Sequence, residues 1–354
     1  MCNIAGYVGT RDAAPVLLEM MEREAGFGGG YYTGIATLSD GELYSAKVLG
    51  DMDRLLAVPG VRELPGTCGI LHSRSNSGGD REWAHPFLSN DETLAYVANG
   101  STGMFASAPG YDRDFAALEL ERRGVRFSSK SSAVGHYPRL ADGSGVHVSE
   151  VMCHLVRTLV ADGFAPEDAL RRAFLTCPAE IVALALHVSC PDTILAARYN
   201  QPMMLGRAAD GVYLATTAMA FPDDVRFDAI DLLPAGCSAS IRCDGWTIHG
   251  FTPPIPVAPL TPSRYAAARE ILFDFIGDTP VTVPECCGAL DVLWPDGSLA
   301  QNAVLCYETL RSMLGENRVR IVPVTVPGAP EGRAEGIEST SLRFVRASAR
   351  RCTH

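Results

Sequence analysis

The stretch Cys2-Asn3-Ile4-Ala5-Gly6-Tyr7-Val8-Gly9 opens with a thiol and continues as a run typical of buried strands. A chain that begins Met-Cys usually loses its methionine, and the thiol then shares a residue with a free α-amine. Because an α-amino group titrates at about pH 7.7–8.0, it can take a proton from a nucleophile at neutral pH. Cys2 is therefore a candidate nucleophile that carries its own general base. Alternatively, Cys2 is only a small apolar residue at the start of a buried strand.

The composition is that of a folded protein with more than one domain. The chain has 354 residues, of which 47% are apolar, and this is enough for a core in two or three domains. Its net charge of −11 argues against a general nucleic-acid surface. No run approaches the ~20 apolar residues that span a bilayer, and no secretory signal is visible, so we expect a cytoplasmic protein without a membrane partner. The 11 cysteines include no CxxC pair, which indicates reduced thiols, and we expect neither a metal site nor a cofactor.

The first 250 residues have the pattern of one layered α+β domain. Helical spacing of apolar residues predicts helices over 15–24, 148–161 and 166–174. Short runs bounded by turn residues predict strands that pair mostly antiparallel. Strands, a helix pair and then more strands indicate packed sheets with helices outside them. The predicted strands are 4–8, 34–38, 43–48, 69–72, 93–98, 181–188, 193–198, 203–205, 212–215, 228–232, 237–241 and 246–250.

A proline-rich stretch separates this region from the rest of the chain. Residues 251–263 (FTPPIPVAPLTPS) contain five prolines and are the best candidate for a linker. Over 264–346 the predicted order is a helix, a short extended segment, two helices (285–293 and 298–314) and a β-hairpin, which is the order of a winged helix. Such a domain suits docking to another protein as well as it suits reading DNA. We interpret 347–354, which contains arginines, as a solvated tail.

Three further segments place polar residues at or just after the ends of predicted strands. Each has a structural explanation when it is taken alone: Asn-Gly after a strand is commonly a turn, and a buried arginine is commonly half of a salt bridge. The segments are Gly69-Ile70-Leu71-His72-Ser73-Arg74-Ser75-Asn76-Ser77, Ala84-His85-Pro86-Phe87 and Tyr96-Val97-Ala98-Asn99-Gly100.

Taken together and in order, these motifs resemble a known family. The N-terminal cysteine, the GxxHxR, AHP and NG segments, and a Ser-Glu-Val that opens the helix at 149–151 resemble the glutaminase domain of class II glutamine amidotransferases, which are N-terminal-nucleophile hydrolases. The resemblance covers about residues 2–250 and is strongest to the glucosamine-6-phosphate synthase type. It implies a four-layer αββα sandwich, followed in this chain by the small winged-helix-like domain.

The resemblance implies a role for each of these residues. Cys2 attacks the side-chain amide carbon of glutamine to give a thioester, and its α-amine moves the proton. The side-chain amide of Asn99 and the backbone N–H of Gly100 form the oxyanion hole. Arg74 grips the substrate carboxylate through its planar fork, and Ser77 lines the same carboxylate. The family's His-Pro, here at His85, shapes a loop and is not the base.

The chain departs from the family where the substrate amine would bind. In the family an aspartate two residues before the helix-opening glutamate binds the α-ammonium of glutamine, and here that position is Val148. Because burying an unpaired cation is costly, we expect free glutamine to bind poorly unless Asp142 or Glu150 reaches the amine, or unless the substrate amine is acylated or absent. The run Gly28-Gly29-Gly30-Tyr31-Tyr32-Thr33-Gly34-Ile35-Ala36 likewise lacks the arginine and the aspartate that precede Gly-Ile-Ala in the family pattern.

We therefore predict an amidohydrolase of the glutaminase type. Its substrate would be glutamine or a γ-glutamyl-type amide, and its ammonia would pass to water or to a separate synthase subunit. Two alternatives stay open: a non-catalytic metabolite sensor that uses a degenerate pocket, and a transcriptional regulator that binds nucleic acid through the C-terminal domain. A homodimer also stays open.

Overall fold

Two antiparallel sheets form the body of the protein. The computed structural model of the chain describes residues 2–100, 110, 112–132, 137–177, 180–327 and 338–347, with the backbone only at 180 and 181. Within them, a seven-stranded sheet has the order β11-β9-β10-β1-β4-β2-β3 and a six-stranded sheet has the order β13-β12-β8-β7-β6-β5. The strands of the first sheet are β1 (Asn3–Gly9), β2 (Tyr32–Ser39), β3 (Glu42–Leu49), β4 (Cys68–Arg74), β9 (Met204–Ala208), β10 (Gly211–Ala215) and β11 (Phe227–Leu232). Those of the second are β5 (Phe87–Leu88), β6 (Leu94–Gly100), β7 (Glu180–His187), β8 (Ile194–Arg198), β12 (Cys237–Arg242) and β13 (Gly245–Gly250).

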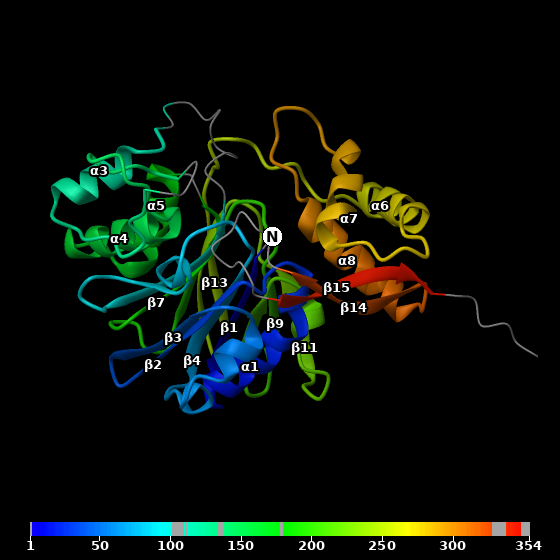
Figure 1. Ribbon diagram of the computed structural model, residues 1–354, viewed down its shortest axis with the longest axis horizontal. Helices are drawn as coiled ribbons and strands as arrows, with labels where there is room; N and C mark the ends of the chain where they lie inside the picture. Colours follow the sequence, from blue (N-terminus) through cyan, green and yellow to red (C-terminus); the bar gives the residue numbers. More distant parts are fainter. Residues whose placement is uncertain are drawn as a thin grey trace, which may run out of the picture.

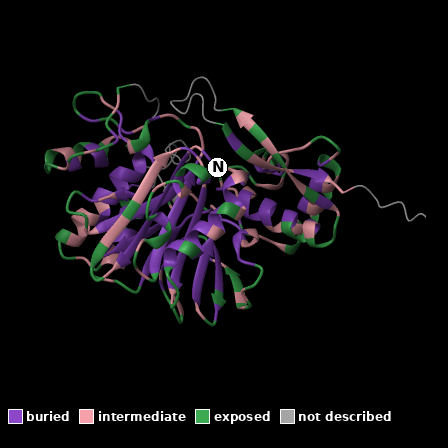
Figure 2. Cartoon of the chain, turned by 60° about the horizontal axis from the view of Figure 1, so that its bottom comes forward, coloured by how far each residue is buried: buried purple, intermediate pink, exposed green. Residues whose placement is uncertain are grey.

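The sheets pack face to face, and helices cover their outer faces (Figure 1). The side chains of β1 contribute to two cores, because successive residues of a strand point to opposite faces of the sheet. Ile4 and Val8 lie in the core between the sheets, whereas Ala5 and Tyr7 lie in the core under the outer helix. Helices α1 (Ala13–Glu24) and α2 (Met52–Leu56) cover the first sheet, and α3 (Phe115–Arg122), α4 (Val148–Ala161) and α5 (Pro166–Thr176) lie on the side of the second. The layers are therefore helix, sheet, sheet, helix, and the buried strands fill the centre of the molecule (Figure 2).

The C-terminal region has its own core. Helices α6 (Pro262–Phe275), α7 (Val283–Ala289) and α8 (Asn302–Gly315) pack with the hairpin of β14 (Val319–Pro327) and β15 (Glu338–Arg346). Val281 bridges Phe344 of β15 through two backbone hydrogen bonds. Thr282 and Glu285 close a capping box at the start of α7. The order of elements is the one that the sequence predicts, and the winged-helix assignment stays a prediction.

The proline-rich segment is tied to the C-terminal region. The Ala258 N–H donates to the Leu299 carbonyl at 3.0 Å, and the Leu299 N–H donates to the Pro256 carbonyl at 2.8 Å. This bridge also explains an error in the predicted helix 298–314, because Leu299 is extended and α8 begins only at Asn302. The short helices α2 and α3 were not predicted. None of the helices in the described parts combines the length and apolar character that a bilayer crossing requires.

Candidate active site

The start of β1 places Cys2 at the end of the first sheet. Asn3 pairs with Ser73 of β4, so Cys2 lies beside the end of the strand that carries His72 and Arg74. The Cys2 side chain is half-buried, and its Sγ atom lies 3.8 Å from the hydroxyl oxygen of Ser75. The thiol is thus held between two strands and remains partly accessible.

The end of β6 brings Asn99 from the second sheet to the same place. The Asn99 side-chain amide donates to the carbonyl oxygen of Cys2 at 3.3 Å, and the pairing of β6 with β7 shifts register between Asn99 and Gly100. Gly100 is exposed and is the last described residue of this segment. The structure therefore brings together Cys2, Asn99 and Gly100, the three residues that the sequence predicts to be catalytic. Their catalytic roles stay predictions.

His72, which the sequence analysis left without a role, links the two sheets beside the thiol. Its Nε2 atom lies 3.0 Å from the Ala98 carbonyl oxygen. Because a carbonyl only accepts, Nε2 must carry the proton, which leaves Nδ1 as an acceptor. That Nδ1 atom is buried and makes no full hydrogen bond to another described residue. Alternation along β4, which puts His72 on the same face as Arg74, is the sequence signal that could have found it.

The surroundings of Cys2 favour its thiolate. Burial is the largest influence and raises the pKa of the Cys2 thiol. A hydrogen bond from the His72 ring, the positive charge that this ring carries once Nδ1 has accepted a proton, the charge of the amino terminus and the backbone N–H of Ser75 together outweigh burial and lower the pKa to about 6. The thiolate is the nucleophilic form of cysteine. A substantial thiolate fraction is therefore expected at neutral pH.

We predict a matching pH dependence for alkylation of Cys2 by iodoacetamide. Its rate should rise as the pH increases through about 6 and level off above it, because the thiolate is the reacting species. In His72→Gln the midpoint should move to higher pH, since the group that lowers the thiol pKa is lost. His187→Gln is the control, because His187 is another buried histidine but bonds Ser189 at 2.8 Å. An unchanged midpoint in His72→Gln would contradict this prediction.

Arg74 is a buried cation with neutral partners. Its side chain is only 2% exposed, and its two Nη groups donate to the Gly78 carbonyl at 2.9 Å and to the Tyr137 hydroxyl at 3.2 Å. The guanidinium also lies over the ring of Tyr32, at 4.6 Å from its centroid. No carboxylate pairs with Arg74 among the described residues, so the salt-bridge alternative is not found there. The carboxylate clamp stays a prediction.

Aromatic and histidine rings fill the space around Arg74. Trp83, Tyr137 and His147 contact one another at centroid distances of 4.8–5.3 Å. His85 stacks on His72 at 3.9 Å and contacts His147 at 5.2 Å. Burial, followed by the charges of neighbouring groups, holds the pKa of His85 and of His147 well below the usual range, so both are neutral. His85 therefore does more than shape a loop, because it packs against the histidine beside the thiol.

Both acidic residues named for the substrate amine have partners within the protein. Glu150 accepts hydrogen bonds of 2.5–3.0 Å from the backbone and hydroxyl groups of Ser128 and Ser129. Asp142 pairs with Lys130 at 2.6 Å, and both side chains are about half-exposed. Both carboxylates are therefore engaged by other residues, which favours the expectation that free glutamine binds poorly.

Ser77 lies in the loop that follows β4, between Ser75, which contacts Cys2, and Gly78, which accepts from Arg74. It is exposed, and its hydroxyl donates to the Ser75 carbonyl within its own loop at 3.5 Å. The structure does not bring it into contact with Cys2 or Arg74, so its role at the substrate carboxylate has only the family resemblance behind it. No group of three or more histidine, cysteine or acidic side chains suited to a metal occurs in the described ranges.

Comparison with known proteins places these features in a family. The glutamine–fructose-6-phosphate aminotransferase of Streptomyces coelicolor is 29% identical over 254 residues, which are 71% of this chain and 37% of that protein. The enzyme of the same name from Tropheryma whipplei is 30% identical over 233 residues, 63% of this chain and 33% of that protein. The chain thus spans about a third of the length of the curated relatives it matches. No family model matches it.

Solved structures agree on the fold. The glutamine phosphoribosylpyrophosphate amidotransferase of B. subtilis superposes with a TM-score of 0.58 at 16% identity, covering 89% of this chain and 64% of that one. A structure described as the allosteric regulatory enzyme of purine biosynthesis gives 0.57, also at 16% identity, covering 87% of this chain and 63% of that one. Paired sheets between helices, with a thiol at the start of a central strand, define an amidotransferase fold of the N-terminal-nucleophile type. The chain carries a class II glutamine amidotransferase domain, which confirms the resemblance.

Proposed function

We propose that this protein hydrolyses a carboxamide through Cys2 and releases ammonia. The thiol proton passes to the α-amine or to Nδ1 of His72, and the sulfur attacks the amide carbon. The oxyanion that forms accepts hydrogen bonds from the Asn99 amide and the Gly100 N–H. Its collapse returns the proton to the leaving nitrogen, expels ammonia and leaves a thioester. Water then cleaves the thioester, giving its proton to the same base, and restores the thiol.

The observation that carries the proposal is the meeting of the two sheets at Cys2. The Asn99 side-chain amide donates to the backbone carbonyl of Cys2 at 3.3 Å, and the thiol of the same residue has a pKa of about 6. A donor already in place at a developing negative charge is the largest single contribution in many acyl-transfer enzymes. The adjacent buried Arg74, with neutral partners, suits a substrate that carries a carboxylate.

The substrate class that fits is an ω-amide of a dicarboxylic acid without a free α-ammonium. Val148, at the start of α4, cannot pair with an ammonium ion, and Glu150 and Asp142 are engaged elsewhere. The start of a helix also carries partial positive charge, which disfavours a cation. N-acylated glutamine and glutaric monoamide meet these conditions, and free glutamine is the poorer substrate. The ammonia released would pass to water or to a synthase subunit.

Asn99 provides a direct test of the oxyanion hole. Asn99→Ala should lower kcat for amide hydrolysis by about 10²- to 10³-fold with little change in KM, because the lost hydrogen bond acts mainly in the transition state. The control is Asn90→Ala, which removes an exposed asparagine that bonds Arg126 beyond the opposite end of β6. Ammonia release under saturating N-acetylglutamine measures both. Full kcat in Asn99→Ala would exclude this assignment.

A further inference from the structure

Three buried polar groups without full hydrogen bonds gather beside the nucleophile. Glu24, the last residue of α1, is completely buried; the backbone N–H groups of Thr216 and Thr217 face its carboxyl, but neither oxygen has a partner with full hydrogen-bond geometry. The side-chain NH₂ of Asn3 and the hydroxyl of Tyr307 are also buried and unpartnered. The Asn3 side chain lies within hydrogen-bonding range of both Glu24 and Tyr307, although neither pair has full hydrogen-bond geometry. Asn3 directly follows Cys2, whereas Tyr307 comes from α8 of the C-terminal region.

Asn3 also holds the glycine-rich loop. Its side-chain oxygen accepts the N–H of Gly29 at 3.0 Å, and the N–H of Gly30 donates to the Ser73 hydroxyl at 2.8 Å. Ser73 immediately precedes Arg74. The loop therefore touches the neighbours of both the thiol and the buried arginine, and a displacement of the loop would reach both.

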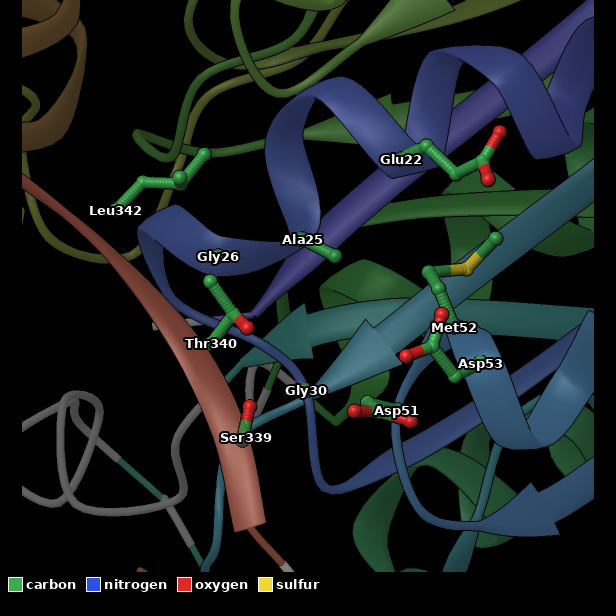
Figure 3. A pocket seen from close by; sticks show the side chains of 10 residues that line it. All are labelled: Glu22, Ala25, Gly26, Gly30, Asp51, Met52, Asp53, Ser339, Thr340 and Leu342. Carbon is green, nitrogen blue, oxygen red and sulfur yellow. The ribbon is translucent and has the colours of Figure 1, made fainter. Parts of the chain in front are cut away.

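The C-terminal region packs against the same loop, residues 26–30. Phe27 belongs to the C-terminal core, where it stacks on Phe344 at 5.6 Å and meets the ring of Tyr307 at 6.0 Å. A Cβ on Gly26 would lie 2.6 Å from the Leu342 side chain, and one on Gly30, which has a φ of +104°, would lie 2.2 Å from the Ser339 hydroxyl. These positions accept only glycine because β15 lies against them (Figure 3). Beyond the contacts, a cavity of about 260 Å³ extends to α2.

We propose that Tyr307 and Glu24 are positioning residues of the amidotransferase site, through which the C-terminal region sets the orientation and reactivity of Cys2 by way of Asn3. The inference rests on the proposed function for its effect on turnover, but its effect on the thiol can be measured separately. Burial raises the pKa of Glu24 well above its usual value, so the group is neutral and places no negative charge beside the thiolate. Its carboxyl oxygens face three donors, the backbone N–H groups of Thr216 and Thr217 and the Asn3 side chain, and a neutral carboxyl can accept from them.

Tyr307→Phe tests the proposal, because it removes the hydroxyl and keeps the ring that contacts Phe27. We expect slower iodoacetamide alkylation of Cys2 and a kcat for N-acetylglutamine that is lower by about 10- to 100-fold, with KM and Tm nearly unchanged, since a small displacement of a reacting group is costly. The matched control is Thr309→Val. Thr309 is buried on the same helix with an unpartnered hydroxyl, and it lies about 200° further around the helix axis.

Glu24 supplies the second variant pair. Glu24→Gln keeps a neutral group of the same shape and should retain wild-type alkylation and turnover, whereas Glu24→Leu should resemble Tyr307→Phe. Equal alkylation rates in Tyr307→Phe, Thr309→Val and the wild type would overturn the proposal. So would parallel losses in Tyr307→Phe and Thr309→Val, which would indicate general destabilisation. If no amide is hydrolysed by the wild type but Tyr307→Phe still slows alkylation selectively, the proposed function fails and the positioning role stands.

Discussion

Cys2→Ala should abolish ammonia release from every amide that the wild-type protein hydrolyses. Removing the nucleophile of an enzyme that works through a covalent intermediate costs at least about a thousandfold in kcat, because no other group forms the acyl bond. The measurement is ammonia release from N-acetylglutamine, glutaric monoamide and glutamine, with the mass of the intact protein recorded in parallel. The matched control is Cys190→Ala, since Cys190 is also free and half-buried.

The same experiment separates the enzyme from the two alternatives. A wild-type protein that releases no ammonia from any of the three amides would favour the non-catalytic sensor. Duplex binding that weakens with salt and disappears when residues 264–354 are removed would favour the transcriptional regulator. The intact mass also identifies the base. A retained methionine would remove the α-amine of Cys2 from consideration and leave Nδ1 of His72 as the acceptor.

The layered fold was predictable because its signals are local. The continuous apolar run at 4–8 marks a strand that is buried on both faces, and the helical spacing of 148–161 marks a helix with one buried face; the structure has β1 and α4 at these places. The predicted start of the helix 298–314 was wrong because a tertiary contact determines the conformation of its first residues. Leu299 pairs with the proline-rich segment and is not part of the helix. The pairing partner of Leu299 is Val257, 42 residues away, and the apolar spacing around Leu299 does not indicate such a distant contact.

The site was only partly predictable for a related reason. Cys2, Asn99 and Arg74 lie in motifs that can be compared with a family, whereas His72 gains its importance from a carbonyl at Ala98 in the other sheet. Tyr307 is more remote still, because its hydroxyl reaches Asn3 only after the C-terminal region folds against the first sheet. Residues whose role arises from long-range packing are found only when the packing is known.

Val148→Asp should change substrate preference toward free glutamine. A carboxylate at the first residue of α4 would supply the missing anion for an α-ammonium, and the partial positive charge of the helix start would stabilise it. An unpaired buried charge costs about 3–5 kcal/mol when its partner is removed, so the ratio of kcat/KM for glutamine to that for N-acetylglutamine should rise by about 150- to 5,000-fold. Competition between the two amides in one assay measures this ratio directly.

Ser149→Asp is the matched control, because it adds the same charge at the next residue of the same helix, about 100° around its axis. It should leave the ratio near the wild-type value. Since Val148 is buried, Tm must be measured with and without glutamine, and Val148→Asn supplies a neutral variant whose ratio should move in the same direction by less. A wild-type protein that already prefers glutamine would contradict the substrate class proposed here. An unchanged ratio in a folded Val148→Asp protein would instead place the amine away from the start of α4. That result would not contradict the proposal that Cys2 hydrolyses carboxamides.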